Sequence, residues 1–130
     1  PGTGDAHLTL AQSSKLSGSI IISTPQDVAL IDARKGINMF KKVNVPVLGI
    51  VENMSYFICS KCNERHEIFS SGGAKKEAEK FETPFLGELP LDKNLRIYSD
   101  EGRPICVSDP ESPIAATYLA IAKKVHSNLH

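Results

Sequence analysis

The sequence has no long hydrophobic run, no excess of charge of either sign and no even set of cysteines. Its apolar stretches fall short of the roughly 20 residues that a membrane-spanning helix needs, so we expect no membrane insertion. Lys and Arg together number 15, as do Asp and Glu, and this balance argues against a nucleic-acid partner. The three cysteines form no disulfide framework, which favours a reducing compartment.

The chain also has no internal repeat and no low-complexity segment. Its 130 residues, 41% hydrophobic and 23% charged, are typical of one globular domain with its own core. Residues 1–5 have the composition of a glycine-rich turn, with no element before it. We therefore expect the chain to be a piece of a longer protein.

Strand and helix patterns alternate along the chain. Runs of β-branched residues predict strands, and apolar residues at helical spacing predict the helices that follow them. The expected elements are strands 19–24, 47–51 and 84–89, helices 6–12, 26–42, 73–81 and 94–99, and a last helix that begins at Ser112–Pro113. This alternation predicts an α/β fold with a mainly parallel sheet, in which the first two strands are parallel.

Three local expectations accompany these elements. Thr24 or Asp27 is expected to cap the helix that follows the first strand. The apolar runs around Ile20 and Ile50 are continuous rather than alternating, which predicts strands buried on both faces. Cys106 lies in a short apolar run and is expected to be a small core residue.

Asn53 follows the second predicted strand directly. Ligands of open α/β sheets bind just beyond the carboxyl ends of the strands, so Asn53 lies where a nucleotide would bind. Its side chain offers both a donor and an acceptor, which suits an adenine edge. A buried amide with a purely structural role fits the same position.

Cys59 and Cys62 form a C-x-x-C pair within a few residues of that strand end. This spacing lets both thiolates bind one metal, whereas a thioredoxin-type pair would follow a strand directly and open a helix. A tetrahedral site needs further ligands, which either His66 or a second copy of the chain would supply. The cations Lys61 and Arg65 are expected to favour the thiolate forms.

Five stretches in this order closely resemble the Mrp/ApbC (NUBPL-like) family of P-loop ATPases, which carry and transfer iron–sulfur clusters and are related to MinD-type ATPases. The stretches are Pro1-Gly2-Thr3-Gly4-Asp5, Ser23-Thr24-Pro25-Gln26-Asp27, Val47-Leu48-Gly49-Ile50-Val51-Glu52-Asn53-Met54-Ser55, Cys59-x-x-Cys62 and Leu86-Gly87-Glu88-Leu89-Pro90-Leu91-Asp92. The resemblance covers essentially the whole chain. It implies the C-terminal part of a MinD-like, three-layer α/β/α P-loop NTPase fold with a mainly parallel sheet.

The resemblance also implies the site residues. Cys59 and Cys62 would hold a 4Fe–4S cluster that bridges a homodimer, and the metal-binding loop would span residues 56–72. Asn53 would contact the adenine of ATP, with Pro90, Leu91 and Asp92 bordering the base. Gly2, Thr3, Gly4 and Asp5 would end the switch segment near the γ-phosphate, with Asp5 as the catalytic candidate.

The chain departs from the family in one large respect. No G-x-x-x-x-G-K-[ST] loop occurs, so the phosphate-binding and Mg²⁺-binding residues would lie upstream. Residues 1–130 would then be a partial ATPase domain that does not hydrolyse ATP alone. The missing strand would leave open sheet edges, and we expect the short chain to associate through them or to be loosely folded.

The sequence therefore predicts an ATP-dependent iron–sulfur cluster carrier that delivers clusters to apoproteins, in a bacterial cytoplasm or a mitochondrial matrix. The alternative is a non-catalytic structural or interaction module in which Cys59 and Cys62 hold zinc.

Overall fold

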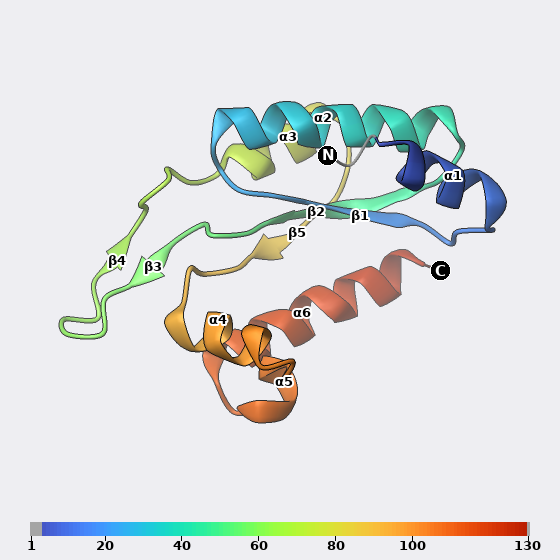
Figure 1. Cartoon of the computed structure of the whole chain (residues 1–130). Coiled ribbons are helices and arrows are strands. Elements are labelled where there is room, and N and C mark those ends of the chain that lie inside the picture. The colour runs from blue at the N-terminus through green and yellow to red at the C-terminus, as the bar shows by residue number, and fades with distance from the viewer. Residues whose placement is uncertain (1–3, 130) are drawn as a thin grey trace.

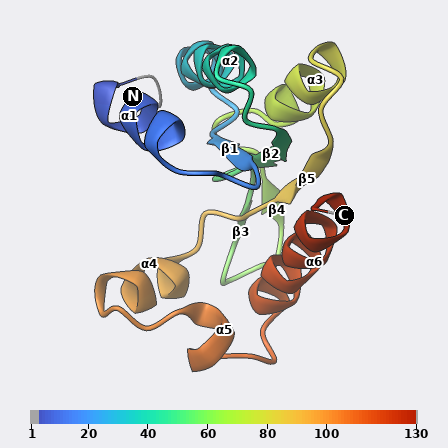
Figure 2. The same ribbon diagram turned by 90° about the vertical axis from the view of Figure 1, so that its right-hand side faces the viewer.

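A computed structural model describes residues 4–129 as three layers, with the sheet between two sets of helices (Figures 1 and 2). The strands are β1 (Ser19–Ser23), β2 (Val47–Glu52), β3 (Phe57–Ile58), β4 (Arg65–His66) and β5 (Phe85–Glu88). The helices are α1 (Asp5–Ser13), α2 (Asp27–Lys42), α3 (Gly73–Lys80), α4 (Lys93–Asp100), α5 (Ile105–Ser108) and α6 (Pro113–Asn128). The expected three-layer α/β/α architecture is therefore confirmed.

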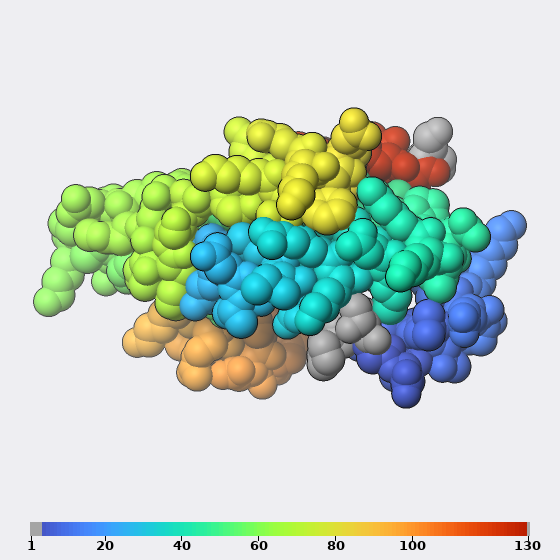
Figure 3. Space-filling model, turned by 90° about the horizontal axis from the view of Figure 1, so that it is seen from above, coloured from blue at the N-terminus to red at the C-terminus, as the bar shows by residue number. Residues whose placement is uncertain are grey.

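The main sheet has the order β1-β2-β5, and both pairs of neighbours are parallel. β3 and β4 form a separate antiparallel hairpin, with Phe57 opposite His66. The hairpin continues from the carboxyl end of β2 and projects away from the body of the molecule (Figures 1 and 3). All three strands of the main sheet end on the side from which the hairpin projects.

Two apolar clusters hold the layers together. On one face, α2 and α3 pack on the sheet around Ile37, Ile50 and Ala74, each 0% exposed. On the other face, α6 packs Ile121 against Val51 and Leu86. Because successive residues of a strand point to opposite faces, Ile50 and Val51 serve the two clusters in turn. The prediction that the Ile50 strand is buried on both faces is confirmed.

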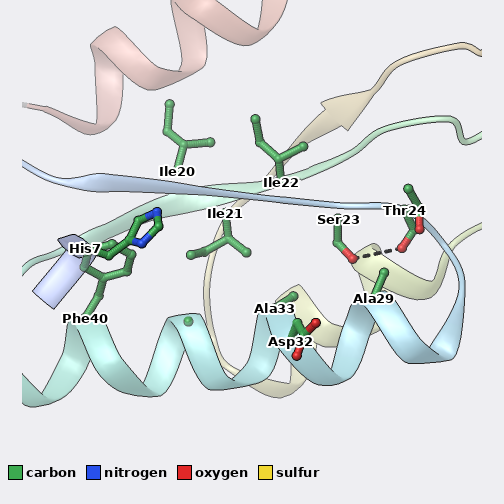
Figure 4. A pocket seen from close by; sticks show the side chains of 11 residues that line it. His7, Ile20, Ile21, Ile22, Ser23, Thr24, Ala29, Asp32, Ala33 and Phe40 are labelled. Carbon is green, nitrogen blue, oxygen red and sulfur yellow. Dashed lines mark hydrogen bonds between the residues drawn. The ribbon is translucent and has the colours of Figure 1, made fainter. Parts of the chain in front are cut away.

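The same prediction is wrong for β1. Ile21 and Ser23 are buried, but Ile20 is 40% exposed and Ile22 is 63% exposed. Figure 4 shows Ile20 and Ile22 on the side of the strand away from α2, while Ile21 points toward that helix. β1 is one of the two edge strands of the described sheet, and α6 covers β5 and β2 on this face rather than β1. The apolar run of β1 therefore lies in an edge strand whose second face, with Ile20 and Ile22, is exposed.

Two smaller expectations also need correction. Gln26 is the N-cap of α2 and makes no side-chain cap bond, and Thr24 instead donates to the Gln26 side chain at 2.9 Å. The run around Cys106 forms the short helix α5, in which Cys106 is only half-buried. By contrast, α6 begins at Pro113 as predicted, and Ser112 caps it by accepting from the Ala115 N–H at 3.2 Å.

An ion pair joins the two helices that cover the first face. Arg34 of α2 donates two hydrogen bonds to the Glu77 carboxylate of α3, at 2.7 and 2.6 Å. The Arg34 hydrogen bond holds the pKa of Glu77 below its usual range, against the opposing effect of burial. No helix in residues 4–129 is both long and apolar enough to cross a membrane.

The lowered pKa of Glu77 predicts how acid acts on the fold. The ion pair stabilises the native state above about pH 4.3, the ordinary pKa of glutamate, and this contribution disappears as the pH falls through the lower native value. The difference in unfolding free energy between wild type and Glu77→Gln should therefore be full near neutrality and shrink below about pH 4. Urea unfolding across this range measures it, with Glu79→Gln on the same helix as control. A difference that does not change with pH would contradict the assignment.

Candidate nucleotide cavity and cysteine hairpin

The carboxyl ends of the three parallel strands are joined by backbone hydrogen bonds. The Asn53 N–H donates to the Ser23 carbonyl at 2.7 Å, linking β2 to β1. The Leu89 N–H donates to the Glu52 carbonyl at 2.8 Å, and the Leu89 carbonyl accepts from the Ser55 N–H at 3.0 Å. The segments that follow β2 and β5 are therefore held side by side, which is where an open α/β sheet places its ligand.

A cavity of about 600 Å³ opens between these segments and α4. Asn53 and Met54 line it from the end of β2, and Pro90, Leu91 and Asp92 line it from the end of β5. Phe57, Ile68, Leu95 and Tyr118 add apolar walls. Its size lies within the range of small-molecule sites, and its chemistry is a mostly apolar slot with a few polar groups. The structure thus brings together four residues expected around a base.

Asn53 is held in place by its own backbone. Its side-chain oxygen accepts from the Met54 N–H at 2.9 Å, and within residues 4–129 its amide nitrogen makes no hydrogen bond. Met54 has a φ of 54°, in the left-handed region that a large side chain seldom adopts. Strain of this kind is worth about 1–3 kcal/mol and collects at functional sites. Asp92, in contrast, already caps α4 by accepting from the Leu95 N–H at 2.8 Å.

The two cysteines lie at the turn of the β3–β4 hairpin. The Cys59 N–H donates to the Glu64 carbonyl at 3.0 Å, and the Asn63 N–H donates to the Cys59 carbonyl at 2.8 Å. Asn63 has a φ of 58°, a conformation that asparagine tolerates better than most residues. Cys59 is half-buried and Cys62 is exposed. The turn therefore presents both thiols at the projecting end of the molecule.

Backbone donors favour the thiolate of Cys59. The pKa of this thiol is lowered chiefly because the Cys62 N–H donates to its sulfur, and the Lys61 N–H and the Cys62 thiol add to the effect. The charges of Lys61 and Arg65, which the sequence predicted would do this, are not among the main causes of the lowered pKa of Cys59. Arg65 instead pairs with Glu88 of β5 at 3.0 Å and lies 3.9 Å from the ring centre of Tyr56.

A buried carboxylate closes the loop that carries the hairpin. Glu52, the last residue of β2, is 0% exposed. It accepts from the Ser55 hydroxyl at 2.7 Å, from the Gly72 N–H at 2.9 Å and from the Ala74 N–H at 2.8 Å. Ser55 lies just before the loop of residues 56–72, and Ala74 lies just after it. One side chain therefore ties both ends of the loop to the sheet.

The two glycines at the end of this loop explain how α3 begins there. Gly72 has a φ of 77°, which glycine adopts without a steric penalty. A side chain on Gly73 would come within 2.8 Å of Leu30 Cδ1 and 3.0 Å of the Pro25 carbonyl oxygen. The Gly72-Gly73 pair therefore allows the close approach of α3 to the start of α2.

Among the described residues, the other two nucleotide-site candidates of the sequence prediction, Gly4 and Asp5, do not join this cavity. Gly4 is the N-cap of α1, and Asp5 is exposed at the start of that helix. Neither lines the cavity around Asn53. Gly2 and Thr3 lie outside the described residues. Sequence reasoning missed Glu52, although an acidic residue that directly ends an apolar strand was a usable signal.

Comparison with known proteins identifies the family to which the chain belongs. The sequence pattern of a family described as "ParA: NUBPL iron-transfer P-loop NTPase" matches residues 1–126. The "Iron-sulfur cluster carrier protein" of Escherichia coli (strain K12) is 54% identical over 130 residues, which make up 100% of this chain and 35% of that protein. The chain thus spans about a third of the length of this relative.

Two solved structures share the architecture. A nucleotide-binding protein from Archaeoglobus fulgidus, in complex with ADP, matches with a TM-score of 0.72 and 43% identity over 86% of this chain and 45% of that one. The Pyrococcus furiosus cell division ATPase MinD matches with a TM-score of 0.67 and 22% identity over 85% of this chain and 43% of that one. The second likeness concerns the fold alone and confirms the MinD-like expectation.

The contacts of Glu52 predict the effect of changing it. Glu52→Gln replaces one carboxylate oxygen with an NH₂ group, which would face the N–H and O–H donors that now bind that oxygen. The broken hydrogen bonds should lower the unfolding free energy by about 1–3 kcal/mol. The loop of residues 56–72 should also be cleaved faster by protease under native conditions. Glu67→Gln, an exposed change inside the same loop, is the matched control. Equal stability and equal cleavage of the two variants would show that Glu52 does not close the loop.

Proposed function

The chain belongs to the NUBPL iron-transfer P-loop NTPase family, and from that premise we propose that the whole protein is an ATP-dependent iron–sulfur cluster carrier. It binds a 4Fe–4S cluster as cargo and transfers it to apoproteins. The observation that carries this proposal is the placement of Cys59 and Cys62 at the turn of a hairpin that projects beyond the sheet (Figure 1).

The proposed cluster bridges two copies of the chain. A 4Fe–4S cluster takes four cysteine thiolates, and one hairpin offers two. A two-fold axis at the hairpin turn supplies the other two from the same surface of the partner. The half-buried Cys59 and the exposed Cys62 are accessible to such a partner. The backbone donors that lower the pKa of Cys59 favour the thiolate that iron binding requires.

The proposed nucleotide is ATP, with its adenine in the cavity beside Asn53. The apolar walls suit a flat base, and the amide nitrogen of Asn53 supplies a donor that the apolar walls lack. Pro90, Leu91 and Asp92 border the base from the opposite segment. Upstream residues of the whole protein hold the phosphates and Mg²⁺, with residues 2–5 near the γ-phosphate and Asp5 as the catalytic candidate.

ATP acts in this proposal by shifting a homodimer between a state that holds the cluster and one that releases it. A nucleotide shifts such an equilibrium only through contacts that differ between the states, and the phosphates with Mg²⁺ supply them. The 130-residue chain alone is then inactive as an ATPase. A reducing compartment, either a bacterial cytoplasm or a mitochondrial matrix, suits the thiols.

The thiols are tested by substitution in the full-length protein. Cys59→Ser and Cys62→Ser should each abolish cluster loading during anaerobic reconstitution, because each removes one bridging ligand from both protomers. Cys106→Ser, in helix α5, should load as wild type does and serves as the control. Iron and acid-labile sulfide content measure the result. Full iron loading of Cys59→Ser contradicts the proposal. A wild type that binds stoichiometric zinc and loads neither iron nor sulfide when reconstituted without zinc would favour the zinc module.

The base contact is tested by Asn53→Ala in the full-length protein. The change should weaken ATP binding by about 1–3 kcal/mol, because the polar edge of the bound base loses its hydrogen-bond partner. Discrimination between ATP and GTP should shrink as well. Calorimetry with both nucleotides measures the two effects, with Asn94→Ala, which does not line this cavity, as control. Unchanged affinity and unchanged selectivity would leave Asn53 a structural role.

A further inference from the structure

The hairpin carries a second set of metal-binding groups beside the cysteine pair. Cys62, Glu64 and His66 each offer one ligand atom, and these atoms all lie within 4.8 Å of one another. The His66 Nε2 and a Glu64 oxygen are already 3.7 Å apart. All three residues are exposed, so their side chains can turn toward a common centre. Cys59 is not part of this group.

The three residues come from the hairpin turn and from β4. Glu64 directly precedes β4 and His66 ends it, and the ligand atoms of both lie on the same side of the chain. Arg65, between them, points to the opposite face, where it contacts Tyr56 and Glu88. The positive charge of Arg65 is therefore paired on the side of the chain away from Cys62, Glu64 and His66. The left-handed conformation of Asn63 turns the chain so that Cys62 joins the same face.

The donor set suits one particular class of ion. Thiolate, imidazole and carboxylate are the three ligand types of Zn²⁺, with bonds of about 2.0–2.3 Å. Tetrahedral geometry with these bonds places a nitrogen and an oxygen ligand about 3.3–3.5 Å apart, so the His66–Glu64 distance needs to shorten by only a few tenths of an ångström. The sulfur needs to approach by about 1.3 Å at most, which rotation of an exposed side chain provides. Three protein ligands and one water complete the tetrahedron.

We infer that Cys62, Glu64 and His66 of a single protomer form a binding site for one Zn²⁺ ion. Cys62 belongs to this site and also to the proposed bridging set, so the two uses of the hairpin exclude each other. A protomer that holds Zn²⁺ has no free Cys62 thiolate to offer to a cluster. This consequence, unlike the zinc site itself, rests on the proposed carrier function.

The ligand set is tested by Zn²⁺ titration of the reduced, metal-free full-length protein against a chromophoric chelator. His66→Asn and Cys62→Ser should each weaken Zn²⁺ binding at least tenfold, and Glu64→Gln should weaken it severalfold. Cys59→Ser should stay within about threefold of wild type, and Glu67→Gln is the control. Circular dichroism verifies that these exposed changes leave the fold intact.

Two results would overturn the site. Equal losses in Cys59→Ser and Cys62→Ser would assign Zn²⁺ to the cysteine pair, and wild-type affinity in His66→Asn would remove the imidazole from the set. Co²⁺ in place of Zn²⁺ gives an independent readout, because a thiolate–cobalt absorption band should vanish in Cys62→Ser and persist in Cys59→Ser.

The mutual exclusion of Zn²⁺ and the iron–sulfur cluster is tested separately from the zinc site itself. One equivalent of Zn²⁺ added before reconstitution should lower iron loading of the wild type and have less effect on His66→Asn, which retains both cysteines. Equal inhibition of the two proteins would overturn the exclusion. Failure of the wild type to load iron even without Zn²⁺ would instead count against the carrier function, while the titration would still decide the zinc site.

Discussion

The buried carboxylate of Glu52 is the interaction on which the functional end of the molecule depends. It accepts hydrogen bonds from Ser55 before the loop of residues 56–72 and from Gly72 and Ala74 around its end. A charged group with no exposed surface is tolerated only when donors surround it, and here the donors belong to the segments that the loop must connect. The hairpin therefore projects from a fixed base, although its tip is solvent-exposed.

The same strand end also positions the cavity. Glu52 accepts through its backbone from Leu89, and Ser55 donates to the Leu89 carbonyl, so the segments on both sides of the cavity share these bonds. Beyond them, the Leu91 N–H donates to the Tyr56 carbonyl at 2.7 Å, and Arg65 of the hairpin pairs with Glu88 of β5. Residues that line the cavity and residues that carry the cysteines are thus joined by a continuous set of hydrogen bonds. In the proposed carrier, a nucleotide and a cluster would bind at the two ends of this set.

Local patterns predicted much of this arrangement. The apolar runs and helical spacing identified β1, β2, β5, α2 and α6 closely. Each of these segments is either a run of strand-forming residues or a stretch of helical spacing, with clear end signals. The grouping of Asn53 with residues 90–92 was also accessible, since parallel strands end at one edge. The edge position of β1 could not be predicted from the sequence, because the exposure of Ile22 depends on which helices cover the sheet rather than on the residues of the strand. Likewise, the role of Glu52 depends on partners about 20 residues away, and the turn of Arg65 toward Glu88 depends on a strand from another part of the chain.

The central claim is that two hairpins, one from each protomer, hold a single cluster between them. Native mass spectrometry of the anaerobically reconstituted full-length protein tests it most directly, because it reports oligomeric state and bound mass together. The account predicts a dimer that carries the mass of one 4Fe–4S cluster, and monomers without bound iron after the cluster is removed. A monomer that carries a complete cluster, or a dimer that carries one cluster in each protomer, would contradict it.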